Sequence, residues 1–233
     1  MRTRKTFSEK ENSSFDLSIS DLMAALCGIF ALIMIVVIVQ LNLSKSEYVS
    51  KNKKAEEYYS MQNNLYKELT EEFKDDLEKW NAEITPDLTI RFTDSEVLFE
   101  PDKAILKNSF KTILSNFFPR LITVLKQDDY KNEIEEIRIE GHTATNERMS
   151  KNQDYTTGMV LSQERTTNVM LYSLNALSEN REWVQKNIAA IGYSNSRPVI
   201  IDNKINSKAS RRVEFKIKTK AEKVVEDLAT KDF

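Results

Sequence analysis

The longest hydrophobic segment lies near the start of the chain. From Leu22 to Val39 the sequence holds 18 consecutive residues without a charge or a side-chain amide. As a helix with a rise of about 1.5 Å per residue, this run spans roughly 27 Å, close to the thickness of the hydrocarbon core of a bilayer. The pattern predicts one transmembrane helix within residues 16–43, preceded by a polar, flexible tail of residues 1–15.

A cleaved signal peptide is the alternative interpretation of this run. Signal peptides usually have an apolar region of about 7–15 residues that ends at a cleavage site of small residues. Here the run is longer and continues into Gln40–Leu43 without an Ala-x-Ala sequence, which favours an uncleaved anchor. Flanking charge does not decide the orientation. Four basic residues lie on each side: Arg2, Arg4, Lys5 and Lys10 before the run, and Lys45, Lys51, Lys53 and Lys54 after it.

Residues 44–86 are interpreted as a linker and a stalk helix. Residues 44–54 are too polar to pack and form the linker. From Tyr59 to Ile84, apolar and aromatic side chains recur mostly every three or four residues, without glycine or proline, which predicts a helix with one apolar stripe. Such a stripe needs a partner, either a second copy of the chain or the domain that follows.

From residue 87 onward, strand and helix patterns alternate. Period-two alternation and short apolar runs predict strands at Leu88–Phe92, Val97–Phe99, Ile134–Glu140, Ile188–Ile191 and Arg212–Lys218. Helices are predicted at residues 101–126, Leu161–Leu177 and Glu182–Lys186, the first kinked or split by Pro119, and residues 144–158 are interpreted as a loop. This order predicts an α/β fold, a βαβαββ sandwich over residues 87–220, followed by a charged tail at 221–233.

Composition excludes several classes of function. The net charge is −2 and no basic stripe occurs, so no nucleic-acid partner is expected. One cysteine and one histidine exclude a disulfide within the chain, a cysteine-based zinc site and any site that needs two imidazoles. Four glycines are too few for a phosphate-binding loop. We therefore predict no catalytic residues, no metal and no cofactor, and we expect the protein not to be an enzyme.

Four segments in residues 88–218 carry a recognisable motif. In order and spacing the chain resembles the OmpA-like peptidoglycan-binding family, which includes the flagellar stator protein MotB. The segments are Gly141-His142-Thr143-Ala144, Gly158 to Thr166 with Leu161-Ser162 and Arg165, Gly192-Tyr193-Ser194 with Pro198, and Ser210-Arg211-Arg212-Val213.

The resemblance implies a set of peptidoglycan-binding residues: His142, Thr143, Leu161, Ser162 and Arg165. Arg165 would bind a carboxylate of the peptide stem through its guanidinium group. The residues themselves leave other interpretations open. Taken alone, His142 is also consistent with a structural histidine and Arg165 with an exposed arginine on a helix. Arg211 and Arg212 are also consistent with the solvated edge of a strand.

Two positions depart from the family motif. Ala144 stands where the family has an aspartate that would pair with the amine of the peptide stem, and Gly158 stands where it has an asparagine. Asp154, between them, is a candidate compensating acid. We expect the chain to bind the cell wall, but more weakly than family members that keep the aspartate, or with a different preference for the stem peptide.

Asp21 begins the apolar run and has two interpretations. As a helix N-cap it would accept hydrogen bonds from backbone amides near Ala24. As an ion carrier it would alternate between charged and neutral forms, because an aspartate in the bilayer costs about 2.5–3.5 kcal/mol. Ser20, Ala24 and Gly28 form a small-residue seam that would let other helices approach.

Asp21 followed by a small- and Met-rich helix resembles the MotB-type stator subunits, and in particular the ZorB-type subunits of Zorya anti-phage systems. This resemblance implies a homodimer that anchors to peptidoglycan and assembles with a multi-spanning MotA-like (ZorA-type) partner, itself pentameric. It also implies a single-pass protein of the bacterial inner membrane, with the tail of residues 1–15 in the cytoplasm and the C-terminal domain in the periplasm. A flagellar-type stator and a static membrane-to-wall tether remain alternatives, and an enzyme of the wall ranks last.

Overall fold

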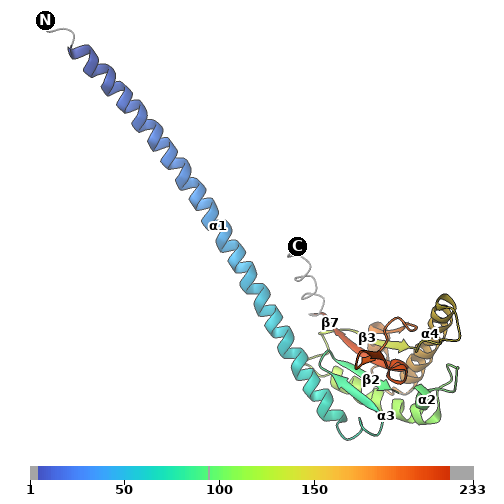
Figure 1. Cartoon of the computed structure of the whole chain (residues 1–233). Coiled ribbons are helices and arrows are strands. Elements are labelled where there is room, and N and C mark those ends of the chain that lie inside the picture. Colours follow the sequence, from blue (N-terminus) through green and yellow to red (C-terminus); the bar gives the residue numbers. More distant parts are fainter. Residues whose placement is uncertain (1–4, 94, 221–233) are drawn as a thin grey trace. The chain divides into compact units, whose positions relative to one another are not determined.

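The computed structural model describes residues 5–93 and 95–220 (Figure 1). The chain divides into two compact units, Met1–Lys54 and Ala55–Phe233. The long helix α1 (Lys5–Phe73) contributes to both units, and the sheet belongs entirely to the second.

In the first unit, α1 is one uninterrupted helix. The expected flexible tail is helical from Lys5, and the expected linker of residues 44–54 is helical as well, so both predictions of irregular chain are wrong for the described residues. The physical reason is the absence of helix breakers, since Gly28 is the one glycine in α1 and proline does not occur there. Within the described residues, one helical stretch, Ser20–Phe73, contains an 18-residue window of mean hydropathy 3.1, long and apolar enough to cross a membrane.

The second unit is built on a five-stranded sheet of order β1-β2-β7-β3-β4. Its strands are β1 (Ala82–Thr85), β2 (Thr89–Thr93), β3 (Ile134–His142), β4 (Ile188–Gly192) and β7 (Arg212–Thr219). β3 and β4 are parallel and are joined through α4 (Lys151–Asn175) and α5 (Arg181–Asn187), while the other pairs are antiparallel. The last strand lies in the centre of the sheet, and the α/β class is confirmed.

One face of the sheet is apolar and packs against helices. Ile90 pairs with Phe215 and Phe92 with Val213, which places these side chains on one face. Phe117 of α3 (Asn108–Leu125) lies with its ring 5.1 Å from that of Phe215, and both rings are buried. Aromatic pairs of this geometry add to the stabilisation from burial alone.

The apolar stripe of the stalk is part of this core. Leu65, Leu69 and Phe73 of α1 are fully buried, and the Phe73 ring lies 5.2 Å from that of Phe117. The stripe therefore packs against the domain that follows, and it cannot serve as the seam between two copies. Arg120 of α3 donates hydrogen bonds to Glu72 and Asp76, both at 2.7 Å, which ties the end of the stalk to α3.

Several boundaries differ from the sequence predictions. The stalk helix ends at Phe73, and its predicted last residue, Ile84, lies in β1. The predicted strand at Val97–Phe99 is mainly the short helix α2 (Ser95–Leu98), with Phe99 in an isolated bridge to Leu106.

The predicted helix at residues 101–126 begins only at Asn108, and Pro119 does not split it. The predicted loop at 144–158 contains the start of α4, because Ser150 caps that helix through its hydroxyl.

The hairpin of β5 (Ile200–Ile201) and β6 (Lys204–Ile205) and the short helix α6 (Ser207–Ser210) were not predicted. Residues 1–4 of the expected tail and the charged tail at 221–233 lie outside the described residues.

Candidate functional site

A groove of about 1440 Å³ runs beside α4. One face of α4 lines it, since the contributing positions recur every three or four residues: Asp154, Thr157, Gly158, Leu161 and Arg165. The other walls are the loop of residues 143–149, the turn at residues 99–102, and the side chains of Lys107 and Arg211. Thr143, Leu161, Arg165 and Asp154, four of the six residues proposed for peptidoglycan contact, therefore line one groove.

Asp154 is a buried acid at the end of this groove that lies beside the N-terminus of α4. The residue is 6% exposed and lies in the first turn of α4. Its Oδ2 accepts hydrogen bonds from the Asn146 backbone amide at 3.1 Å and from Nδ2 of Asn195 at 2.6 Å. Within the described chain it forms no ion pair, so neutral donors hold this carboxylate in place.

Arg165 is a buried cation further along the same helix face. It is 7% exposed, so the interpretation as an exposed helix arginine is wrong. Its Nε donates to the Lys103 carbonyl oxygen at 3.0 Å, and the guanidinium carbon lies 4.7 Å from the centroid of the Phe99 ring. Burial lowers the pKa of Arg165, with Asp102 opposing that shift and Arg211 adding to it. Arg165 also forms no ion pair among the described residues.

Ser162 lies beneath the surface of the groove and contributes to its packing. It is buried outside the groove lining, its hydroxyl donates to the Met159 carbonyl oxygen, and its Oγ accepts the Ser194 amide at 3.0 Å. A Cβ at Gly192 would lie 2.6 Å from that Oγ, so glycine is required for β4 to approach α4 this closely. The geometry gives Ser162 a packing role.

The departure from the family motif at Gly158 is physically coupled to Ser194 and Thr143. A Cβ at Gly158 would lie 2.4 Å from Oγ of Ser194 and 2.7 Å from Oγ1 of Thr143. Ser194 has φ 54, a left-handed conformation that favours glycine, and its hydroxyl donates to the Tyr155 carbonyl oxygen at 2.8 Å. The serine occupies the space next to residue 158, which explains why an asparagine side chain does not fit there.

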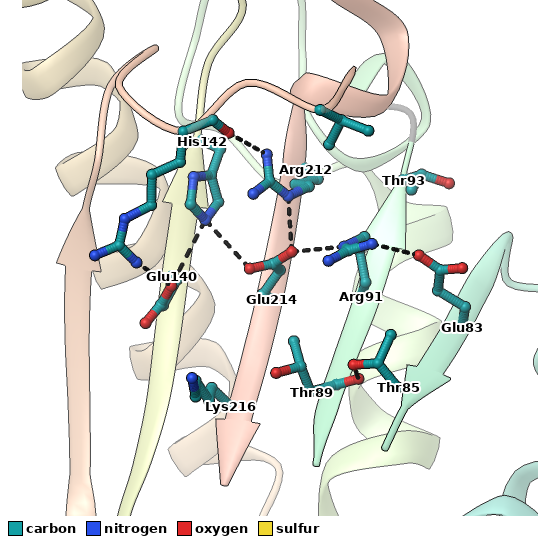
Figure 2. Close-up of polar contacts among 12 residues, drawn as sticks. Glu83, Thr85, Thr89, Arg91, Thr93, Glu140, His142, Arg212, Glu214 and Lys216 are labelled. Carbon is teal, nitrogen blue, oxygen red and sulfur yellow. Dashed lines mark hydrogen bonds and ion pairs between the residues drawn. The ribbon is translucent and has the colours of Figure 1, made fainter. Parts of the chain in front are cut away.

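His142 lies on the other face of the sheet, in a network of charges (Figure 2). Its Nε2 is 3.4 Å from Oε2 of Glu214 and 3.7 Å from Oε2 of Glu140, and its ring stacks on Tyr193. Neither ring nitrogen forms a hydrogen bond in the described structure, and the residue is buried and absent from the groove lining. The structure therefore does not bring His142 into the groove with Arg165.

Glu214 is the centre of this network. Its Oε1 accepts hydrogen bonds from Nε of Arg91 at 2.5 Å and from Nε of Arg212 at 2.7 Å. Burial favours the neutral form, but His142, Arg212 and Arg91 outweigh it and hold the pKa of Glu214 well below its usual range. Arg212 is buried and paired, so its interpretation as part of a solvated strand is wrong.

Glu140, His142 and Glu214 offer three ligand atoms within 4.8 Å of one another, which is close enough for a metal ion. Arginines already balance both carboxylates, however. Arg91 and Arg212 pair with Glu214, and Arg197 and Arg138 lie 3.3 Å and 3.8 Å from Glu140. A divalent cation would add uncompensated positive charge here, so the donor set fits a network of ion pairs better than a metal centre.

Asp21 lies in the first unit, on α1, with an exposed side chain. The helix begins at Lys5, well before Asp21, so Asp21 does not cap a helix and that interpretation is wrong. The residue stands at the entrance of the apolar run, one position after Ser20. Its role as an ion carrier stays a prediction.

Comparison with known proteins gives three similarities. The OmpA family matches residues 98–212. The Zorya protein ZorB of Escherichia coli is 39% identical over 212 residues, which cover 88% of each chain. Among solved structures, a MotB-like protein from Desulfovibrio vulgaris is 25% identical with a TM-score of 0.51, over 70% of this chain and 94% of its own. The expectation that the chain is not an enzyme stays a prediction.

Proposed function

Because the chain belongs to the ZorB family and carries an OmpA-family domain, we propose that it is the stator-type subunit of a proton-driven inner-membrane complex that serves anti-phage defence. Its apolar helix spans the membrane once, and its sheet domain holds peptidoglycan. The observation that carries this proposal is the match to ZorB over 88% of the chain.

In the membrane, Asp21 is the proposed ion carrier. A single helix with one carboxylate cannot enclose a pathway for an ion, because its other sides face lipid. The pathway therefore needs a multi-spanning MotA-like (ZorA-type) partner, pentameric, around a homodimer of this chain. The seam of Ser20, Ala24 and Gly28 is the surface through which the helices approach closely. The N-terminus lies in the cytoplasm and the sheet domain in the periplasm.

At the cell wall, the groove beside α4 is the proposed binding site. Thr143, Leu161 and Arg165 line it and contact the peptide stem. The guanidinium group of Arg165, with no carboxylate partner of its own in the described chain, binds a carboxylate of the wall. His142 and Ser162 do not contact the peptide. They support the groove indirectly, because His142 stacks on Tyr193 and Ser162 accepts a hydrogen bond from the Ser194 amide.

A flagellar-type stator is the second candidate, favoured by the similarity to the MotB-like protein of Desulfovibrio vulgaris. Both candidates need an ionisable Asp21 and a wall anchor. The two candidates differ in the process that the motor drives. Loss of the protein should abolish protection in a phage-infection assay if it serves defence, and should abolish motility in a swimming assay if it serves a flagellum. The phage assay uses a strain that carries the complete defence system.

The decisive experiment substitutes Asp21 in that strain. Asp21→Asn keeps the size of the side chain but cannot release a proton, so protection against phage should be abolished at normal protein levels. Asp21→Glu keeps a carboxylate and should retain part of the protection. Leu22→Ile, one residue away and outside the seam of Ser20, Ala24 and Gly28, is the control and should leave protection near that of the wild type. Full protection by Asp21→Asn would contradict the motor and leave a static tether.

A further inference from the structure

His142 is the only histidine of the chain, and its side chain is 1% exposed. Both ring nitrogens are enclosed, and neither forms a hydrogen bond among the described residues. Buried polar atoms are usually hydrogen-bonded, because an unpaired one loses its contact with water and gains nothing in return. The neutral ring of His142 is therefore poorly satisfied where it lies.

A charged ring would be better satisfied at the same place. Nε2 of His142 faces Oε2 of Glu214 at 3.4 Å and Oε2 of Glu140 at 3.7 Å, so it lies between two carboxylates (Figure 2). In the charged ring Nε2 is a charged donor, which forms stronger hydrogen bonds to carboxylate oxygens than a neutral donor does. A small shift of the ring then closes contacts that the neutral ring lacks.

Burial and the arginines of the network oppose this charge. The remaining ionisable groups of the network come from three strands and from the turn after β4: Glu136 and Arg138 on β3, Arg212 on β7, Arg91 on β2 with its partner Glu83, and Tyr193 and Arg197 in the turn. Each of these arginines pairs with a carboxylate, and the pKa of Glu214 is held well below its usual range, so Glu214 stays ionised near neutral pH. Histidine is the side chain whose charge ordinarily changes between about pH 5 and 8.

The ring of His142 is connected to the groove through the turn after β4. It stacks on Tyr193 with the two ring planes 12° apart. The carbonyl oxygen of the next residue, Ser194, accepts a hydrogen bond from the Thr143 amide at 2.8 Å, and the Ser194 hydroxyl lies next to Gly158. Thr143 and Gly158 both line the groove. A shift of the His142 ring therefore acts, through Tyr193, on the turn that supports one wall of the groove.

We propose that His142 is a pH-sensitive positioning residue of the groove. When the ring is charged, it bonds both carboxylates and holds the Tyr193–Ser194 turn in the form that binds the wall. When the ring is neutral, these bonds are lost and the wall is bound more weakly. The inference rests on the proposed wall binding and adds its regulation by pH. Because binding and protonation are coupled, a bound wall fragment must in turn increase the charged fraction of the ring.

Retention of the full-length chain on purified sacculi, in detergent from about pH 5.5 to about pH 8.5, tests this proposal. Retention of the wild type should fall about fivefold as the pH rises through this range, a modest coupling between two sites. His142→Phe keeps an aromatic ring beside Tyr193 but cannot be charged, so its retention should not change with pH. Lys216→Met removes a cation from the same face of the sheet, 4.0 Å from Asp87, and is the matched control that should keep the wild-type profile.

Each outcome of this assay decides a different point. Wild-type retention that is the same at every pH would overturn the inference while leaving wall binding intact. A pH profile that persists in His142→Phe would belong to another group and would also overturn it. A wild type that is not retained at any pH would overturn the proposed wall binding and the inference with it.

NMR of the wild type tests the same proposal without any variant. When histidine alone carries ¹⁵N, the ring signals report only His142, because the chain has no other histidine. These signals should change between about pH 5.5 and about pH 8.5, and soluble muropeptides released from the same sacculi should increase the charged fraction at about pH 7. Ring signals that do not change with pH, or that titrate identically with and without muropeptides, would overturn the inference.

Discussion

Buried charges are ion-paired on one side of the sheet domain and lack an ion-pair partner on the other, within the described residues. Across β2, β7 and β3, Glu214 is shared between Arg91 and Arg212, and each carboxylate of the network faces a cation. Along the groove beside α4, Asp154 and Arg165 are equally buried and have no ion-pair partner in the described chain. The difference separates structure from binding. Charges that pair with one another hold neighbouring strands together, whereas Asp154 and Arg165 are held by neutral groups, as we propose for charges that bind a ligand.

The largest expected effect is on the paired face. Glu214→Ala leaves two arginines without their shared carboxylate and should lower the free energy of unfolding by about 3–5 kcal/mol. Glu83→Ala removes an exposed partner of the same Arg91 and should cost about 0–1 kcal/mol. Urea denaturation of the two variants measures both values, and equal losses would contradict the assignment of Glu214 as the centre of the network.

The groove face should show the reverse pattern. Arg165→Met removes the charge that we propose binds a carboxylate of the wall, with an expected loss of about 1.5–3 kcal/mol in binding to sacculi, at least tenfold in retention. Stability should fall by less than that, because an uncompensated buried charge is removed together with one hydrogen bond. Arg148→Met, on the exposed rim of the groove, is the control. A variant that loses stability but keeps its retention would place Arg165 among the structural charges.

The close approach of residues 158 and 194 predicts a smaller effect. Gly158→Ala places a Cβ against Ser194 and Thr143 and should destabilise the domain by about 1–3 kcal/mol. Ser194→Gly frees part of that space, so the double variant should lose less stability than the sum of the two single variants. Thermal unfolding of the four proteins in this cycle measures the coupling, and strict additivity would show that the two positions are independent.

Acid should weaken the paired face first. The pKa of Glu214 is lowered in the folded protein, so its contribution to stability is present above the unfolded value of about 4.5 and is lost as the pH falls below it. Denaturation curves of the wild type from pH 7 down to pH 3 should therefore show a loss that is smaller in Glu214→Gln. The same loss in both proteins would mean that other carboxylates dominate.

The sequence predicted the class of the fold and most of its strands because their signals are local. Period-two alternation located β2, β3 and β7, and the uninterrupted apolar run located the candidate membrane helix. The family motif pointed to Thr143, Leu161 and Arg165, which all line the groove. Residues in a motif lie at fixed positions along strands and helices. Their spacing can therefore be recognised in the sequence without knowledge of the fold.

Tertiary structure decided which charged residues are paired. Arg212 and Glu214 alternate with apolar residues as a solvated edge strand would, yet β7 lies between β2 and β3, and the neighbouring strands supply Arg91 and His142. Leu69 and Phe73 fit a helix seam between two copies equally well, until the domain core covers them. Asp154 was expected in a loop, and the capped start of α4 placed it on the same helix face as Arg165. Local patterns specify where a side chain points relative to its own element, whereas its partners come from segments distant in sequence and are determined only when those segments pack.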